Sequence, residues 1–290
     1  MALPGFASSR QVVGEAHYAL WEAGTGDPVL LLHGFPETHA CWWSVAPALT
    51  ASWRVVAPDL RGYGASVAPA GGLHGEGYTK REMADELVEL MAARGFDAFS
   101  VVGHDRGGRV GFRMALDHPS AVRRLAVINI VPTIDQFERM GAGPSLGYWP
   151  WFLLAQPAPL PERLLTADPE AVLDHAFDTW ASLPTAIDGD RRAAYLAAMT
   201  PDTIAAMCGD YRASFHIDRH HDLADRAAGR RITAPTLVVT GRDEAQLGDA
   251  ESVWRPWAED LTVVRVPGGH FVPEEAGGDL VDQLRKFLSA

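Results

Sequence analysis

The chain has 290 residues, of which 47% are hydrophobic and 21% charged, and its formal net charge is −12. This balance is typical of a globular protein and excludes a largely disordered chain. The acidic excess disfavours nucleic acid and anionic membranes as partners, so a small anionic ligand would need local positive charge in order to bind.

The cysteines and the N-terminal segment carry no cross-linking or targeting signal. Cys41 and Cys208 are far apart in the sequence, which predicts two buried, reduced thiols rather than a disulfide framework or a metal site. The first residues lack the basic region and apolar core of a signal peptide. The most apolar run, YWPWFLLA (148–155), is too short to span a bilayer. We therefore expect a cytoplasmic protein.

The first half of the chain predicts strands alternating with helices. Residues 17–23 (HYALWEA) alternate as in a half-buried strand. Later runs are continuous in Val and Leu, which is typical of strands covered on both faces of a parallel sheet. Strands are expected at 28–34, 53–59, 99–105 and 123–132. Helices are expected at 78–95, where apolar residues recur at helical spacing before Gly95, and at 106–118.

The central part of the chain has a different character. Residues 133–232 contain no strand-like Val/Ile run and consist of helical pieces broken by prolines. From Pro235 the alternation resumes, with strands at 235–241 and 261–269 and helices near 250–258 and at 279–288. This order predicts one doubly wound α/β domain with a mostly parallel sheet and an inserted helical cap. The core would comprise 1–135 and 229–290, and the cap 136–228.

The segment VVGHDRGGRVGF (101–112) carries the first candidate catalytic group. Asp105 stands between Gly103 and Gly107, where an apolar strand changes to a helix. This is the G-x-nucleophile-x-G pattern of a nucleophile elbow, which exposes its side chain at the end of the sheet. The helix N-terminus would stabilise an ionised carboxylate there. The alternative is that Asp105 is a simple helix N-cap.

Two other segments fit the same chemistry. In HGFP (33–36) the backbone N–H of Phe35 would point at the site as an oxyanion donor, with the N–H of Arg106 as the second. The alternative is an ordinary Gly-Pro turn. In PGGHF (267–271) His270 follows a strand and comes after Asp105 in the chain, as expected of the catalytic base; a structural histidine is the alternative.

Together these three motifs resemble the α/β-hydrolase superfamily over essentially the whole chain. An Asp nucleophile is similar to that of haloalkane dehalogenases, epoxide hydrolases and haloacetate dehalogenases. GHDRGGR, with Arg rather than Trp after Asp105, resembles the haloacetate (fluoroacetate) dehalogenases. This resemblance implies that Arg106 and Arg109 clamp the substrate carboxylate, for which the guanidinium group is well suited. The alternative is that both arginines pair with buried acids.

The cap segments at 148–162 and 208–215 resemble those that line the halide pocket of that family. The resemblance implies that Trp151 and Tyr211 donate hydrogen bonds to the leaving halide; packing within the cap is the alternative. Pro150 stands where the family usually has a halide-binding His. Fluoride should suffer most from the loss of a donor, so we expect chloro- and bromoacetate to be preferred to fluoroacetate.

The acid that orients His270 also departs from the family. Asn129 occupies the position where these dehalogenases carry it, and Asn cannot stabilise an imidazolium by charge. In VVTGRDEAQ, however, Glu244 follows Gly241 by three residues, where most α/β hydrolases carry their acid. We expect Glu244 to be the acid, with adjacent Asp243 as the alternative. A further alternative is that Asn129 marks a site with impaired hydrolysis.

These observations predict a hydrolase that converts a 2-haloacid to the 2-hydroxy acid through an aspartyl ester, without cofactor or metal. One alternative is an epoxide hydrolase that uses Asp105, His270 and the cap residues Tyr148 and Tyr211. Another is a non-catalytic receptor for a small molecule on the same scaffold. Members of the family are often dimers, but no stretch of this sequence indicates an interface.

Overall fold

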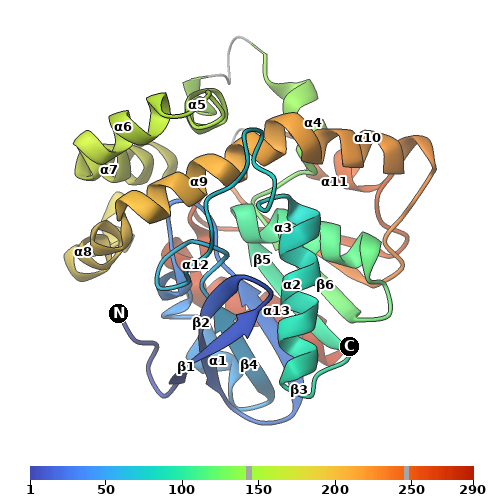
Figure 1. Cartoon of the computed structure of the whole chain (residues 1–290). Coiled ribbons are helices and arrows are strands. Elements are labelled where there is room, and N and C mark those ends of the chain that lie inside the picture. Colours follow the sequence, from blue (N-terminus) through green and yellow to red (C-terminus); the bar gives the residue numbers. More distant parts are fainter. Residues whose placement is uncertain (142–145, 245–247) are drawn as a thin grey trace.

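A computed structural model describes residues 1–141, 146–244 and 248–290. Eight strands of the described residues form one sheet, in the order β1-β2-β4-β3-β5-β6-β7-β8 (Figure 1). Their bounds are β1 Ala7–Val13, β2 Ala16–Ala23, β3 Asp27–Leu32, β4 Trp53–Pro58, β5 Phe99–His104, β6 Val122–Ile128, β7 Thr236–Gly241 and β8 Leu261–Val266. The β1/β2 and β2/β4 pairs are antiparallel and the others parallel. The predicted mostly parallel sheet is confirmed.

The central strands are covered on both faces, which explains their continuous apolar runs. Leu30 and Leu32 of β3 pack in the cluster that includes the helices on one side of the sheet, whereas Val29 and Leu31 pack in the cluster on the other. All four side chains are fully buried. Strand β1 escaped the sequence analysis because, of its seven residues, only Val13 is fully buried, so it lacks an apolar pattern.

Helices flank the sheet and a helical segment covers one of its ends (Figure 1). The flanking helices are α1 Ala46–Leu49, α2 Lys80–Ala93, α3 Asp105–Asp117, α11 Ala250–Trp254, α12 Val272–Glu275 and α13 Gly277–Ser289. Between β6 and β7 the described residues form no strand of the sheet, and their α-helices are α4 Thr133–Arg139, α5 Trp149–Leu153, α6 Leu160–Ala167, α7 Pro169–Trp180, α8 Gly189–Ala198, α9 Pro201–Ala213 and α10 Arg219–Ala227. A π-helical turn at Ser214–Asp218 joins the last two. The expected helical insertion is therefore present.

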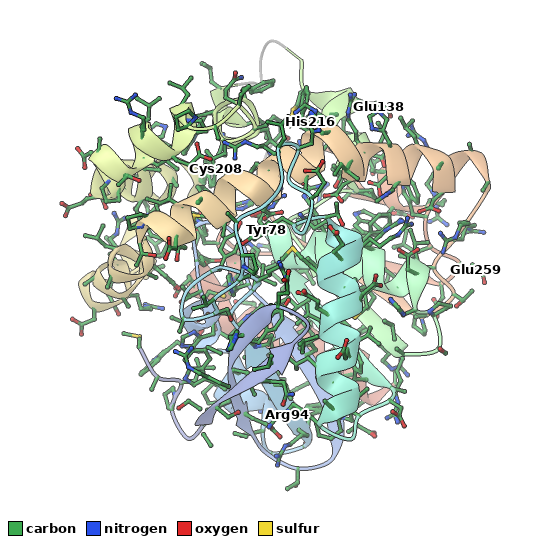
Figure 2. All side chains as sticks on the ribbon, viewed as in Figure 1. Tyr78, Arg94, Glu138, Cys208, His216 and Glu259 are labelled. Atoms are coloured by element: carbon green, nitrogen blue, oxygen red, sulfur yellow. The ribbon has the colours of Figure 1, made fainter. Side chains whose placement is uncertain are left out.

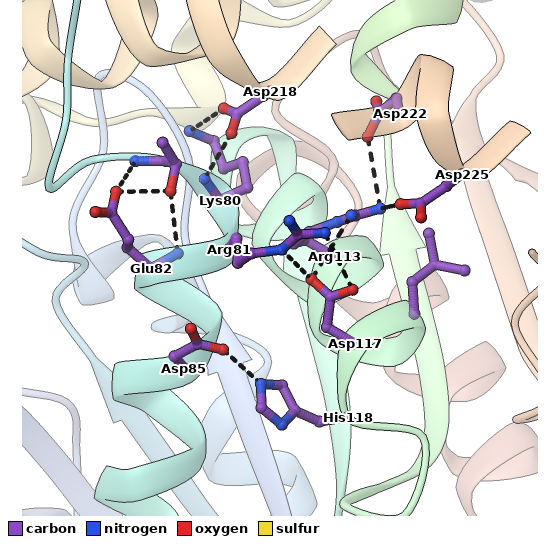
Figure 3. Close-up of polar contacts among 12 residues, drawn as sticks. Lys80, Arg81, Glu82, Asp85, Arg113, Asp117, His118, Asp218, Asp222 and Asp225 are labelled. Carbon is purple, nitrogen blue, oxygen red and sulfur yellow. Dashed lines mark hydrogen bonds and ion pairs between the residues drawn. The ribbon is translucent and has the colours of Figure 1, made fainter. Parts of the chain in front are cut away.

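The helical segment is held to the core by ion pairs on α3. Arg113 of α3 contacts Asp225 of α10 at 2.5 Å and Asp222 of α10 at 3.7 Å (Figure 3). Asp117, one turn further along α3, accepts from Arg81 of α2 at 2.7 Å. Because α3 begins at Asp105, the two contacts of Arg113 fix the helical segment relative to the candidate nucleophile, whereas the Asp117–Arg81 pair joins α3 to α2 within the core.

The described residues contain no helix that is both long and apolar enough to cross a membrane. Cys41 and Cys208 are buried free thiols, as predicted, and Cys208 lies in α9 (Figure 2).

Candidate active site

The candidate catalytic groups meet at the carboxyl ends of the parallel strands, beneath the helical segment. Phe35 follows β3, Asp105 follows β5, and Asn129, Glu244 and His270 follow β6, β7 and β8. Loops that leave parallel strands at one edge converge there. They enclose a cavity of about 40 Å³, lined by Asp105, Arg109, Asn129, Gln136, Gly147, Tyr148, Pro150, Trp151, Trp180, Tyr211, Glu244 and His270.

The turn that carries Asp105 is tight and strained. Asp105 has a φ of +43°, in the left-handed region that glycine adopts readily and residues with a side chain adopt rarely. A Cβ on Gly107 would lie 2.4 Å from the carbonyl oxygen of Leu32, so only glycine fits. A Cβ on Gly34 would lie 2.5 Å from Cβ of Asp105. This close approach lets the N–H of Phe35 donate to Asp105 Oδ2 at 3.2 Å.

Asp105 is held in its ionised form. Burial by itself raises its pKa, but the positive charges of His270 and Arg106, with smaller contributions from His104 and Arg109, hold the pKa below the ordinary value for Asp. The carboxylate is therefore negatively charged at neutral pH and available as a nucleophile.

Glu244 is the acid that the structure brings to His270. Its Oε2 lies 3.1 Å from Nδ1 of the His270 ring, and both side chains are largely buried. Burial alone lowers the pKa of His270, but the Glu244 carboxylate and then Asp105 raise it above its ordinary value. Nε2, at the other end of the ring, is buried and has no hydrogen-bond partner in the described parts of the chain. The adjacent Asp243 is exposed, and its backbone N–H donates to the carbonyl of Gly268 at 3.1 Å.

Asn129 contacts the backbone of both neighbouring loops. Its Nδ2 donates to the carbonyl oxygens of Gly269 at 2.8 Å and His270 at 2.7 Å, and its Oδ1 accepts from the N–H of Gly241 at 2.8 Å. An ionised carboxylate could not donate to the two carbonyls, so an amide is the group that fits this position. Asn129 thus holds the loop that carries His270, rather than its ring.

Arg106 and Arg109 occupy different surroundings, although both were expected to clamp a substrate. The Arg106 guanidinium is fully buried, donates to Asp210 from Nε at 2.9 Å and from Nη2 at 2.7 Å, and does not line the cavity. Arg106 thus pairs with a buried acid, as a charge removed from water needs a counter-charge, and its contact with substrate stays a prediction. Its Nη1 has no hydrogen-bond partner among the described residues.

Arg109 does line the cavity. It donates to the carbonyl of Val131 and, through Nη2, to Oε1 of Gln136 at 3.1 Å. Its Nε is buried and pairs with none of the atoms that the structure describes. Burial and the neighbouring Arg106 lower the pKa of Arg109 to about 10. The group therefore remains positively charged at neutral pH, next to the candidate nucleophile.

Trp151 and Tyr211 form an aromatic corner of the cavity. Their rings meet edge to face with centroids 5.4 Å apart. The guanidinium of Arg106 lies 4.1 Å from the centre of the Tyr211 ring, and that of Arg109 lies 4.7 Å from the Trp151 ring. Burial and the charge of Asp105 raise the pKa of Tyr211 well above its ordinary value, so the phenol keeps its proton and can donate it in a hydrogen bond.

Several residues around the site were not found from the sequence. The carbonyl of Trp180 accepts from the N–H of His270 at 2.9 Å, which ties the helical segment to the candidate base. His104 Nε2 lies 2.9 Å from the carbonyl of His270, and its Nδ1 lies 2.8 Å from Glu37. These contacts run between segments far apart in the chain, and no local pattern signals them. Among the described residues, no group of three or more His, Cys, Asp or Glu side chains is arranged to hold a metal ion.

Comparison with known proteins places this geometry in context. Residues 27–276 match the family model described as the alpha/beta hydrolase fold. The chain is 39% identical to a fluoroacetate dehalogenase from Burkholderia sp over 98% of this chain and 94% of the relative. It is 31% identical to a soluble epoxide hydrolase from Corynebacterium sp (strain C12) over 94% of this chain and 93% of the relative.

Solved structures give the same picture of the fold. A crystal structure of a candidate alpha/beta hydrolase from Nostoc sp PCC 7120 superimposes with a TM-score of 0.95 and is 40% identical, with 98% of each chain covered. The likeness extends over the sheet and the inserted helical segment, because nearly the whole of both chains is matched.

Proposed function

The chain belongs to the α/β-hydrolase family, and on this premise we propose that it is a hydrolytic dehalogenase of small 2-haloacids. The proposal rests mainly on one observation: Arg109, a cation at neutral pH, lines the same cavity as the anionic Asp105 and the His270–Glu244 pair. An anionic nucleophile repels an anionic substrate, and the guanidinium offsets this repulsion while binding the substrate carboxylate.

In the first step, Asp105 displaces the halide. Oδ2 already accepts from the N–H of Phe35, which leaves Oδ1 to attack the halogen-bearing carbon from the side opposite the halide. A carbon–oxygen bond forms, the carbon–halogen bond breaks, and the halide departs with the bonding electrons. Trp151 and Tyr211 donate hydrogen bonds to it.

In the second step, His270 activates water. Nε2 takes a proton from a water molecule, and the resulting hydroxide adds to Cγ of the ester. The negative charge then forms on Oδ2, where the N–H groups of Phe35 and Arg106 stabilise it. The C=O bond to Oδ2 re-forms as the Cγ–Oδ1 bond breaks, and the 2-hydroxy acid leaves with Oδ1 after its alkoxide takes the proton from Nε2 of His270. Asp105 then loses the proton of its new carboxyl group to solvent and is again a carboxylate. Esterification also removes the negative charge of Asp105, which is one of the causes that raise the pKa of His270. The ring therefore becomes a neutral base more readily at the stage that requires one.

The lining of the cavity favours chloride and bromide over fluoride as leaving groups. Pro150 contributes no side-chain donor to the lining, which leaves Trp151 and Tyr211 to receive the halide. Fluoride is the most strongly hydrated halide and loses most when donors are few. Chloro- and bromoacetate are therefore the proposed substrates, and fluoroacetate a poor one.

An epoxide hydrolase is the second candidate, and one observation favours it: Tyr148 and Tyr211 both line the cavity, so two phenols are available to protonate an epoxide oxygen. Against it stands the charge of the cavity wall. The guanidinium of Arg109 faces a site that an uncharged epoxide would occupy, and it would gain no partner there, whereas a haloacid carboxylate supplies one.

The two candidates are separated by parallel assays with chloroacetate and styrene oxide. Chloride and glycolate released over many turnovers, without diol from styrene oxide, are expected. Diol formation without halide release from any haloacetate would favour the epoxide hydrolase. Binding of a small acid with neither turnover nor covalent adduct would indicate a non-catalytic receptor.

A further inference from the structure

Gln136 is a buried polar residue of the cavity wall for which the sequence suggests no role. It lies in α4, its exposed fraction is 3%, and it lines the cavity together with Arg109 and Asp105. A buried amide must satisfy both its oxygen and its nitrogen, because an unpaired polar group removed from water is costly.

The orientation of the Gln136 amide follows from its neighbour. Arg109 has donors only, so the atom that faces its Nη2 at 3.1 Å must be the oxygen, Oε1. The amide nitrogen, Nε2, therefore points away from that contact. Burial raises the pKa of Tyr148, whereas the contact of its hydroxyl with Gln136 lowers it, as expected when the amide nitrogen faces the phenol oxygen. An amide NH₂ has two hydrogens, so the buried Nε2 has a second one that no acceptor in the described residues receives.

The surroundings contain an excess of buried donors. Within the described part of the chain, two buried nitrogens of the cavity wall carry N–H hydrogens without an acceptor, Gln136 Nε2 and Arg109 Nε. Donors without acceptors indicate a site built for a ligand that brings acceptor oxygens and negative charge. A carboxylate supplies both, with lone pairs on each of its two oxygens.

We propose that Gln136 recognises the substrate carboxylate directly, with Nε2 donating to one carboxylate oxygen while Arg109 binds the group and neutralises its charge. The inference rests on the proposed function and extends it, because it assigns Gln136 the discrimination between carboxylates and neutral carboxamides. A neutral carboxamide would present its own NH₂ group to these donors, and N–H groups of both the ligand and the protein would then lack acceptors.

Two substitutions separate this role from a purely structural one. Gln136→Met keeps the length of the side chain but removes both polar atoms. Gln136→Glu keeps an acceptor for Arg109 and replaces the donor by a second acceptor. Glu138→Gln is the matched control, because Glu138 lies in the same helix but is exposed and pairs with Arg226. Thermal unfolding of each variant checks that it folds.

The measured quantity is the ratio of kcat/KM for chloroacetate to that for chloroacetamide. Gln136→Met is expected to lower it about 10- to 100-fold, the size of a lost hydrogen bond to a charged group. Gln136→Glu is expected to lower it further and to raise kcat/KM for chloroacetamide above the wild-type value. Glu138→Gln should leave the ratio unchanged. A Gln136→Met ratio within about threefold of wild type, too small for a charged hydrogen bond, would overturn the proposal. So would the absence of any gain for chloroacetamide in Gln136→Glu.

Affinity for acetate, an unreactive carboxylate, tests the inference separately from turnover. Calorimetry with the wild-type protein and Gln136→Met is expected to give at least about a tenfold weaker Kd for the variant. If the wild type bound acetate but released no halide from chloroacetate, the proposed function would fail. The role of Gln136 would still be decided by the two Kd values, and equal values would refute it.

Discussion

Replacing Glu244 with Gln removes the negative charge beside His270 but keeps an oxygen that can accept the same hydrogen bond. The atoms concerned, Oε2 and Nδ1, are 3.1 Å apart and largely buried. Two unit charges about 4 Å apart interact by about 4 kcal/mol at an effective dielectric constant of 20. The imidazolium that forms during ester hydrolysis loses this stabilisation, so that step should slow about a thousandfold.

The two chemical steps should respond differently. Chloride release in the first turnover depends on Asp105 and should change little in Glu244→Gln, whereas glycolate release should become slow. Rapid-quench sampling with chloroacetate would then give one equivalent of chloride, and intact mass spectrometry a carboxymethyl adduct on Asp105. The control is Asp243→Asn, because Asp243 is adjacent but exposed.

The pH profile provides a second readout. His270 acts as a base only when neutral, so hydrolysis falls as the pH drops through its pKa. Glu244 raises that pKa, and its replacement should move the acidic limb of the profile to lower pH. Wild-type turnover and an unmoved profile in Glu244→Gln, or a defect confined to Asp243→Asn, would refute the reasoning.

Three other predictions concern stability and halide preference. Asp210→Asn should lower the free energy of unfolding by about 3–5 kcal/mol, because Arg106 and Lys80 lose their buried counter-charge; a urea titration showing a change below about 1 kcal/mol would contradict this. Pro150→His would restore a donor to the cavity wall and should raise defluorination relative to dechlorination, measured with ion-selective electrodes; an unchanged ratio would count against the halide assignment. Burial and the nearby Glu37 raise the pKa of Glu274 from 4.5 to about 8. Between these two pH values the native state holds a proton on Glu274 that the unfolded chain has released, so the free energy of unfolding should fall as the pH rises from about 5 to 8. Glu274→Gln should flatten that decline in urea unfolding at about pH 5 and pH 8, and a slope equal to wild type would exclude Glu274 as its source.

Much of the fold could be predicted because the central strands carry their own signal. Strands with both faces buried, such as β3, are continuously apolar, and turns such as the one at Asp105 are marked by the glycines that close backbone contacts require. Strand β1 was missed for the converse reason: its side chains are mostly exposed, and its place in the sheet depends on pairing with β2.

The site could be predicted where position along a strand decides a role, and not where tertiary contacts do. Asp105, Glu244 and His270 follow β5, β7 and β8, parallel strands that the sequence marks, so their meeting at one edge was foreseeable. The engagement of Arg106 by Asp210 joins residues 104 positions apart, and no local pattern selects that acid. Likewise, the amide of Asn129 makes sense only once the three backbone groups it contacts are known.

The most direct test of the account is to incubate the purified protein with chloroacetate, to measure chloride and glycolate over time, and to record the intact mass of the protein. The account predicts multiple turnovers with equal amounts of chloride and glycolate, and it predicts that Asp105→Asn releases neither product. The absence of both chloride release and an adduct on Asp105 would contradict it.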